Sequence, residues 1–249
     1  WRIGHEATLA AIAHADAILT MSAKDHAGLR PLVTRPGYLQ MFPPFIDAQP
    51  FAAALACRQR HRDELSGRAQ IDPAMPWLSV AAMMRSGDKL QSYRTLARIL
   101  MTLRDFDWVL LVAGDGPARC DVVESFAGLG PHRVRYLGVL DPDKLAGAYA
   151  ASDLYVWPAV REAYGMSMLE AQAAGCPVVA GRYGGVPDIV IDGVTGQVVA
   201  PEDDSAFANA VRILLADPER RMSMGHEAAR HIATRHDLIS ASVRLGQIL

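Results

Sequence analysis

Two glutamates frame a glycine turn in the segment 161–187, and their type and spacing are the clearest chemical signal in this chain. Glu162 and Glu170 are separated by seven residues, and the glycine between them opens a short predicted helix. The first N–H groups of a helix have no intrahelical partner and carry the positive end of its dipole. We expect these donors to hold an anion such as a diphosphate. Four backbone positions supply them: Gly165, Met166, Ser167 and Met168.

The two glutamates differ in their relation to this predicted anion site. Glu170 lies one turn further into the helix, where it is expected to accept hydrogen bonds from sugar hydroxyls. Glu162 precedes the turn, so it would lean over the group attached to the outer phosphate. Together they favour a nucleotide-sugar site.

Turns with glycine or basic residues follow other predicted strands. Gly114 and Gly116 come after a buried strand, where glycine lets a ligand approach the backbone closely. They start a dinucleotide-binding pattern that Arg119 breaks at its third glycine, so an ordinary strand-to-helix turn is an equal alternative. Lys89 and Arg85 stand in the turn after another strand, where each would reach a phosphate or else remain in solvent.

Two acidic pairs, at 105–107 and 141–143, have the D-x-D pattern that holds a metal-bound nucleotide in some transferases. Both have local explanations, the first as a turn before a strand and the second as a helix N-cap followed by proline. His226 and His231 are five positions apart, whereas a zinc-binding helix needs a spacing of four. We therefore expect no metal site.

Strands and helices alternate regularly from residue 77 onward. Near-continuous apolar runs predict strands at 77–83, 108–113, 134–137, 154–157, 177–180 and 197–200. Helical patterns cover 90–103, 120–128, 142–151 and 166–174, and two or three amphipathic helices follow between 205 and 249. This alternation predicts an α/β fold, a Rossmann-like doubly wound parallel sheet with helices on both faces. Ligands of such sheets bind outside the carboxyl ends of the strands, so the turns at 85–89, 114–117, 137–141 and 162–165 are expected to line one crevice.

The first part of the chain follows a different pattern. A helix at 7–15, a strand at 17–21 and a helix begun by Ser22, with Asp25 in a capping-box relation, make a single β-α step. The segment 36–50 is rich in proline and aromatic residues, which favours an extended linker or hinge. A polar helical stretch is expected around 52–66.

Composition sets further bounds. With 249 residues and 51% hydrophobic content, the chain is long enough for one large or two ordinary domains. A net charge of -2 with interspersed signs argues against a nucleic-acid partner. Three widely spaced cysteines predict a reducing, cytoplasmic location, and no apolar run is long enough to suggest a transmembrane segment. Because the sequence starts at Trp1 within a helical pattern, we expect further sequence upstream.

Several short motifs occur in a characteristic order over residues 77 to about 205. They are Gly114-Asp115-Gly116-Pro117, Tyr136-Leu137-Gly138, Ala151-Ser152-Asp153, Pro158, Glu162 to Gly165, Glu170-Ala171, Gly175 with Pro177-Val178-Val179, Gly184-Gly185-Val186-Pro187-Asp188, and Asp192-Gly193 with Thr195-Gly196. With the E-x7-E frame, this set resembles the retaining glycosyltransferases of the GT-B fold, family 4 (glycosyl transferases group 1). The stretch Ala82-Met83-Met84 departs from the Gly-Arg-Leu usual in that family, which displaces the basic residue to Arg85.

The resemblance implies two Rossmann-like domains that face each other across a cleft. Residues 1–47 would be the C-terminal remnant of the acceptor domain, 48–75 a linker and helix, 76–232 the donor-binding domain, and 233–249 a helix that packs back on the acceptor domain. Lys89 would hold the donor diphosphate, Glu170 the ribose hydroxyls and Glu162 the transferred sugar. The remaining donor contacts would come from Arg85, Gly114, Gly116, Leu137, Tyr164, Gly165, Met166, Ser167 and Met168.

The implied activity is transfer of a hexosyl group from a UDP-, GDP- or ADP-sugar to a sugar, lipid-linked or small-molecule acceptor. It would proceed with retention of anomeric configuration and without metal or cofactor, by same-face attack or through a short-lived ion pair. Peripheral membrane contact through an upstream domain stays open. Two alternatives remain: a sugar-nucleotide epimerase of the same architecture, and a nucleotide-sugar-binding module or truncated fragment without transferase activity.

Overall fold

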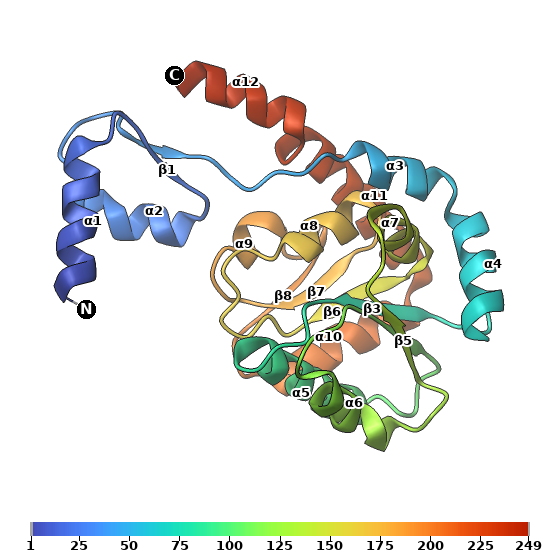
Figure 1. Ribbon diagram of the computed structural model, residues 1–249. Coiled ribbons are helices and arrows are strands. Elements are labelled where there is room, and N and C mark those ends of the chain that lie inside the picture. Colours follow the sequence, from blue (N-terminus) through green and yellow to red (C-terminus); the bar gives the residue numbers. More distant parts are fainter. Residues whose placement is uncertain (1, 249) are drawn as a thin grey trace.

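The computed structural model describes residues 2–248 and shows a sheet domain with a smaller N-terminal unit beside it (Figure 1). Residues 1 and 249, the outer ends of the predicted segments 1–47 and 233–249, lie outside the described residues. The N-terminal unit consists of α1 (Arg2–His14), β1 (Ile18–Thr20), α2 (Ala23–Leu29), η1 (Arg30–Leu32) and β2 (Leu39–Met41). Two helices, α3 (Gln49–Ala56) and α4 (Arg58–Ala69), lead to the sheet domain.

The sheet domain alternates strands and helices as predicted. Its strands are β3 (Trp77–Ala81), β4 (Val109–Ala113), β5 (Val134–Gly138), β6 (Leu154–Trp157), β7 (Val178–Gly181) and β8 (Gly196–Val199). Its helices are α5 (Asp88–Met101), α6 (Arg119–Phe126), η2 (Ala127–Leu129), α7 (Pro142–Ala151), α8 (Met166–Ala173), α9 (Val186–Ile189), α10 (Asp204–Ala216) and α11 (Pro218–Arg235). The chain then continues into α12 (Leu238–Ile248).

The six strands form one sheet in the order β5-β4-β3-β6-β7-β8, and every neighbouring pair is parallel. Helices α5, α6 and α10 cover one face, and α7, α8 and α11 cover the other (Figure 1). This arrangement confirms the predicted α/β doubly wound fold. The strand order reverses between β3 and β6, which is where sheets of this kind bind ligands.

The apolar strand runs are explained by burial on both faces of the sheet. All residues of β4, β6 and β7 are buried, and the side chains of Leu78, Leu110 and Val156 are completely so. Tyr93 on α5 packs edge-on against Trp157 at the end of β6, with ring centroids 5.1 Å apart. The core therefore lies directly beneath the switch point.

Two details of the connecting region differ from the expectation. The helical stretch predicted around 52–66 is two helices, because Cys57 leaves the helical region at φ -108° and ψ 21°. The predicted extended linker contains β2, which pairs in parallel with β1. Among residues 2–248, no helix combines the length and the apolar composition that a bilayer crossing requires.

Hydrogen bonds join the N-terminal unit and the linker to the rest of the described chain. The amide of Ala23, at the start of α2, donates to Asp188 at 2.9 Å, and the Tyr164 hydroxyl donates to Asp25 at 3.3 Å. Further along, the linker contacts the turn between α11 and α12, where the Ile46 amide donates to the His236 carbonyl at 2.9 Å. The four predicted domain segments remain predictions, although the whole six-stranded sheet lies within 76–232.

Candidate functional site

A cavity of about 270 Å³ opens at the carboxyl edge of the sheet, next to the switch point between β3 and β6. It is lined by Ala81 and Ala82 at the end of β3, by Lys89 in the first turn of α5, and by the segment from Glu162 to Ser167. The structure therefore brings Lys89, Glu162, Tyr164, Gly165, Met166 and Ser167 together, six of the residues that the sequence singled out. These residues form the candidate active site.

Glu162 is held by two donors on one of its oxygens. Lys89 Nζ lies 2.5 Å from Glu162 Oε2, and Trp157 Nε1 donates to the same oxygen at 3.1 Å. The ammonium also lies 5.5 Å from the Trp157 ring centroid. Within residues 2–248 Oε1 has no protein partner, so one carboxylate oxygen is fixed and the other is available to a substrate.

The first turn of α8 offers free backbone donors, as expected. Gly165 has a left-handed conformation at φ 89°, and no side chain caps the helix. The amides of Met166 and Ser167 have no protein acceptor within residues 2–248. The predicted donor Met168 differs, because its amide donates to the Gly165 carbonyl at 2.9 Å and its side chain is fully buried. An anion would therefore meet the start of this turn.

Glu170 lies one turn beyond that edge and is half-buried. The Tyr149 hydroxyl donates to its Oε2 at 3.1 Å. Burial raises the pKa of the Glu170 carboxyl, and the Tyr149 hydrogen bond partly offsets this effect. One side of the carboxylate is thus fixed by a buried phenol, and its other oxygen has no protein partner within residues 2–248.

Tyr164 and Ser167 connect the anion-binding turn to its surroundings. The Tyr164 hydroxyl reaches Asp25 of the N-terminal unit. Ser167 Oγ lies 2.8 Å from the hydroxyl of Tyr155, a fully buried side chain that also donates to the Ala81 carbonyl. Tyr155 therefore ties the start of α8 to the end of β3.

Gly114 and Gly116 lie in the turn after β4, directly against the backbone that follows β3. A Cβ on Gly114 would lie 2.2 Å from the Ala82 carbonyl oxygen, and one on Gly116 would lie 2.3 Å from that of Met84. Their φ values of 117° and 151° are also unfavourable for other residues. Close backbone packing accounts for both glycines, and it brings their turn next to Ala82 at the cavity.

Arg85 and Leu137 do not line this cavity. Arg85 is exposed, and its guanidinium has no protein partner within residues 2–248. Leu137 packs with the cluster around Trp77 and lines a separate cavity of about 350 Å³. Neither of these predicted donor contacts gains support from side-chain position.

Sequence reasoning missed three aromatic residues that position the site: Tyr149, Tyr155 and Trp157. All three are fully buried. In the sequence they look like core residues of a strand or helix, since only their polar ends reach the site. Tyr149 is 21 positions from Glu170, so no local pattern marks that pair.

The predicted local roles of the acidic pairs can be checked at Asp141. Its Oδ1 accepts from the Lys144 amide at 2.9 Å, which confirms Asp141 as the N-cap of α7. Throughout residues 2–248, no three His, Cys, Asp or Glu side chains are grouped as a metal-ion site would require.

Curated relatives of the chain are glycosyltransferases. It is 37% identical to the D-inositol 3-phosphate glycosyltransferase of Corynebacterium diphtheriae over 145 residues, which cover 56% of this chain and 34% of that protein. The enzyme of the same name from Nocardia farcinica is 34% identical over 198 residues, covering 76% of this chain and 44% of that protein. The chain thus spans less than half the length of these relatives.

Solved structures share the fold. Sucrose-phosphate synthase from Thermosynechococcus elongatus superimposes with a TM-score of 0.77 at 26% identity, over 97% of this chain and 59% of that chain. HepE of Anabaena, solved in complex with UDP and glucose, has a TM-score of 0.73 at 18% identity, over 95% of this chain and 63% of that chain. The sequence model described as "Glycosyl transferases group 1" matches residues 78–217, which is more than half of the chain. The chain therefore belongs to the glycosyl transferases group 1 family, and its sheet domain has the fold of GT-B glycosyltransferases.

Proposed function

We propose that this chain is the donor-binding part of a retaining glycosyltransferase that moves a hexosyl group from a nucleoside-diphosphate sugar to an acceptor without a metal ion. One observation carries the proposal. Glu162 is fixed by Lys89 and Trp157 through one oxygen, immediately before a helix start with free amides. A carboxylate, an ammonium and an anion-binding turn thus share one cavity.

Release of the nucleoside diphosphate leaves negative charge on phosphate oxygens. The free amides of Met166 and Ser167 would accept part of this charge, together with the dipole of α8. Lys89 lines the same cavity, so its ammonium would neutralise more of it. These groups are already oriented in the folded protein, which is the condition for electrostatic catalysis.

Glu162 would act on the transferred sugar. Glycosyl transfer passes through a state with positive charge on the sugar ring, which a nearby carboxylate stabilises. The free oxygen, Oε1, would also accept a hydrogen bond from a sugar hydroxyl. Lys89 between the carboxylate and the diphosphate would keep these two anions from repelling each other.

Glu170 would bind the ribose hydroxyls. An ionised carboxylate accepts these hydrogen bonds more strongly than a protonated carboxyl, and burial works against ionisation here. Tyr149 compensates by donating to Oε2. In this division of roles Glu170 binds the nucleotide, whereas Glu162 contacts the transferred sugar.

The proposed acceptor follows from the relatives of the chain. The relatives named D-inositol 3-phosphate glycosyltransferase favour a small polyol phosphate over a lipid-linked acceptor. A cytoplasmic location, peripheral membrane contact and the choice between same-face attack and an ion pair remain predictions.

Calorimetric titration of the chain with UDP, GDP and ADP, each with and without EDTA, tests the donor site. We expect one base to be preferred and its affinity to be unchanged by chelation. Loss of binding in EDTA would contradict the metal-free mechanism, and no binding of any nucleotide would contradict the donor site. Product analysis without acceptor separates the epimerase alternative, since only an epimerase converts the sugar nucleotide by itself.

A further inference from the structure

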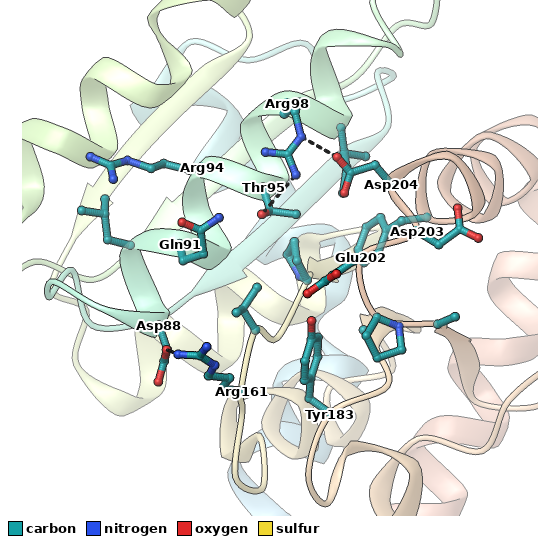
Figure 2. A pocket seen from close by; sticks show the side chains of 18 of the residues that line it. Asp88, Gln91, Arg94, Thr95, Arg98, Arg161, Tyr183, Glu202, Asp203 and Asp204 are labelled. Atoms are coloured by element: carbon teal, nitrogen blue, oxygen red, sulfur yellow. Dashed lines mark hydrogen bonds and ion pairs between the residues drawn. The ribbon is translucent and has the colours of Figure 1, made fainter.

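A second cavity, larger than the donor cavity, has a volume of about 710 Å³ (Figure 2). This volume is within the roughly 300–1,000 Å³ typical of small-molecule sites. The cavity lies at the carboxyl ends of β6, β7 and β8, between α5 and the loop that leads into α10. It adjoins the donor cavity, because Asp88 and Arg161 line it while the next residues, Lys89 and Glu162, line the other.

Its lining combines hydroxyl-binding groups with an apolar floor. Gln91 from α5, Tyr183 after β7 and Glu202 after β8 face the cavity, and Tyr183 points its hydroxyl toward Glu202 (Figure 2). Within residues 2–248 none of these three side chains has a protein hydrogen-bond partner. Buried apolar side chains, among them Ile99 and Phe207, form the floor. Sugars present hydroxyl edges and apolar faces, so this combination suits them.

The charges of the lining argue against an anionic ligand. Its three arginines face four carboxylates, so acidic groups outnumber basic ones. Two of the arginines are also engaged within the cavity wall. Arg98 Nε lies 2.5 Å from Asp204 Oδ2, and Arg161 lies 3.5 Å from Asp88 (Figure 2). A phosphate would have to displace these carboxylates, whereas a neutral hydroxyl would not.

Backbone strain is concentrated at the same place. Four non-glycine residues of the described chain have positive φ, and two of them line this cavity: Arg161 at 50° and Glu202 at 62°. A third, Ala159 at 56°, lies between the lining residues Pro158 and Val160. Backbone strain of this kind is enriched at ligand sites. Glu202 is held in this conformation on the cavity wall although no protein group accepts or donates to its side chain.

We propose that this cavity is a second carbohydrate-binding site, which holds a neutral saccharide or polyol through Gln91, Tyr183 and Glu202 next to the donor sugar. The site is separate from the donor cavity and does not need a bound nucleotide. Its position across the Asp88–Arg161 contact suits an uncharged sugar unit of a growing glycan, and not the polyol phosphate proposed above as the acceptor.

An NMR titration of the ¹⁵N-labelled chain with glucose, and separately with glucose 6-phosphate, tests this site. Glucose at millimolar concentration should shift the amides of Gln91, Tyr183 and Glu202, and the shifts should persist in the Glu162→Gln variant. Tyr183→Phe should weaken glucose binding about fivefold to tenfold, the loss of one hydrogen bond. Tyr164→Phe removes the same group from the donor cavity and should leave glucose affinity unchanged.

Any of three results would overturn the proposal. The first is that glucose shifts no amide signals, and the second is that the shifted signals all belong to residues 162–167. The third is that glucose 6-phosphate binds more tightly than glucose. The last result would identify an anion site instead. Tyr183→Phe keeps the aromatic ring, so we expect its melting temperature to be unchanged. In that case a loss of glucose affinity cannot be explained by unfolding. The test is independent of the donor site, so failure there leaves this proposal standing.

Discussion

Two ion pairs join the start of α5 to the segment after β6, and they differ sharply although they are neighbours. Lys89 and Glu162 are 2.5 Å apart, with side chains only 22% and 14% exposed. Asp88 and Arg161, the residues immediately before them, are 3.5 Å apart and 46% and 79% exposed. The two segments therefore form one covered pair toward the donor cavity and one solvated pair toward the larger cavity.

The difference shows that burial, not sequence position, decides what a charge pair contributes. Exposed pairs contribute little, because water screens them and their side chains lose entropy. A covered pair is more consequential, since removing one partner leaves the other charge poorly solvated. The covered pair has the further donor Trp157 Nε1, whereas the exposed pair has none within residues 2–248. We propose that the Lys89–Glu162 pair takes part in the reaction, and that the Asp88–Arg161 pair only separates the two cavities.

The largest effect is expected for Glu162→Gln in the active transferase that contains this chain. Turnover should fall by about tenfold or more, because each 1.36 kcal/mol of lost transition-state stabilisation is a factor of ten. Steady-state rates with the preferred donor measure it. Glu124→Gln, on the exposed surface of α6, is the matched control and should leave turnover unchanged. If Glu162 merely supports the α8 dipole, the variant will keep normal turnover with a loss of about 0.3–1 kcal/mol in stability.

A smaller effect is expected on the free energy of unfolding, and it distinguishes the two ion pairs. Lys89→Met should lower the free energy of unfolding by about 1–2 kcal/mol, because the Glu162 carboxylate loses its cation while covered. Arg161→Met should change it by about 0.5 kcal/mol or less, as expected for an exposed pair. Urea unfolding of both variants measures the difference. Equal losses would mean that the contrast in burial has no energetic consequence.

A further effect concerns two imidazoles near the linker. The rings of His231 and His236 are 5.1 Å apart, and His236 Nδ1 lies 2.8 Å from the Pro44 carbonyl oxygen. Burial, mutual repulsion and the nearby Arg235 and Arg230 lower the pKa of His231 to about 4. Burial also lowers the pKa of His236, with Arg244 and Arg235 adding to the effect, while the Pro44 bond and Asp188 oppose it.

Stability should therefore fall as the pH is lowered. The unfolded chain protonates both rings near their ordinary pKa of 6.5, whereas the folded chain resists protonation until lower pH. The stability is present above pH 6.5 and is lost progressively from there toward about 4. Melting temperatures at pH 7 and pH 5 should differ by roughly a few degrees. His231→Leu should reduce this dependence, and His226→Gln, on the exposed side of α11, should not.

The fold could be predicted because the composition of its strands indicates whether one face or both faces of the sheet are covered. Runs such as 109–113 and 154–157 are apolar without alternation, which only a sheet covered on both faces explains. The capping residues Ser22 and Asp141 were equally readable, since a cap is a local contact. The break at Cys57 was not, because neither a glycine nor a proline marks it.

The site was predictable only as far as it is local. The turn at Gly165 and its flanking glutamates lie within one short segment, so their types and spacing pointed to an anion and a sugar. The groups that orient them come from elsewhere in the chain, such as Tyr149 for Glu170. The direction in which Leu137 faces could not be predicted from its strand, and the structure packs its partly buried side chain against the cluster around Trp77. Contacts between distant segments need the tertiary structure.

Central to this account is the division of roles between the two glutamates, and calorimetry on two variants tests it most directly. The chain, Glu162→Gln and Glu170→Ala are each titrated with the preferred nucleoside diphosphate and with its sugar-bearing form. Glu170→Ala should weaken both ligands equally, by about 1–3 kcal/mol, the scale of a lost hydrogen bond to a charged group. Glu162→Gln should leave the nucleoside diphosphate unaffected and weaken the nucleotide-sugar. If Glu162→Gln weakens both ligands alike, or Glu170→Ala weakens neither in a folded protein, the proposed division is wrong.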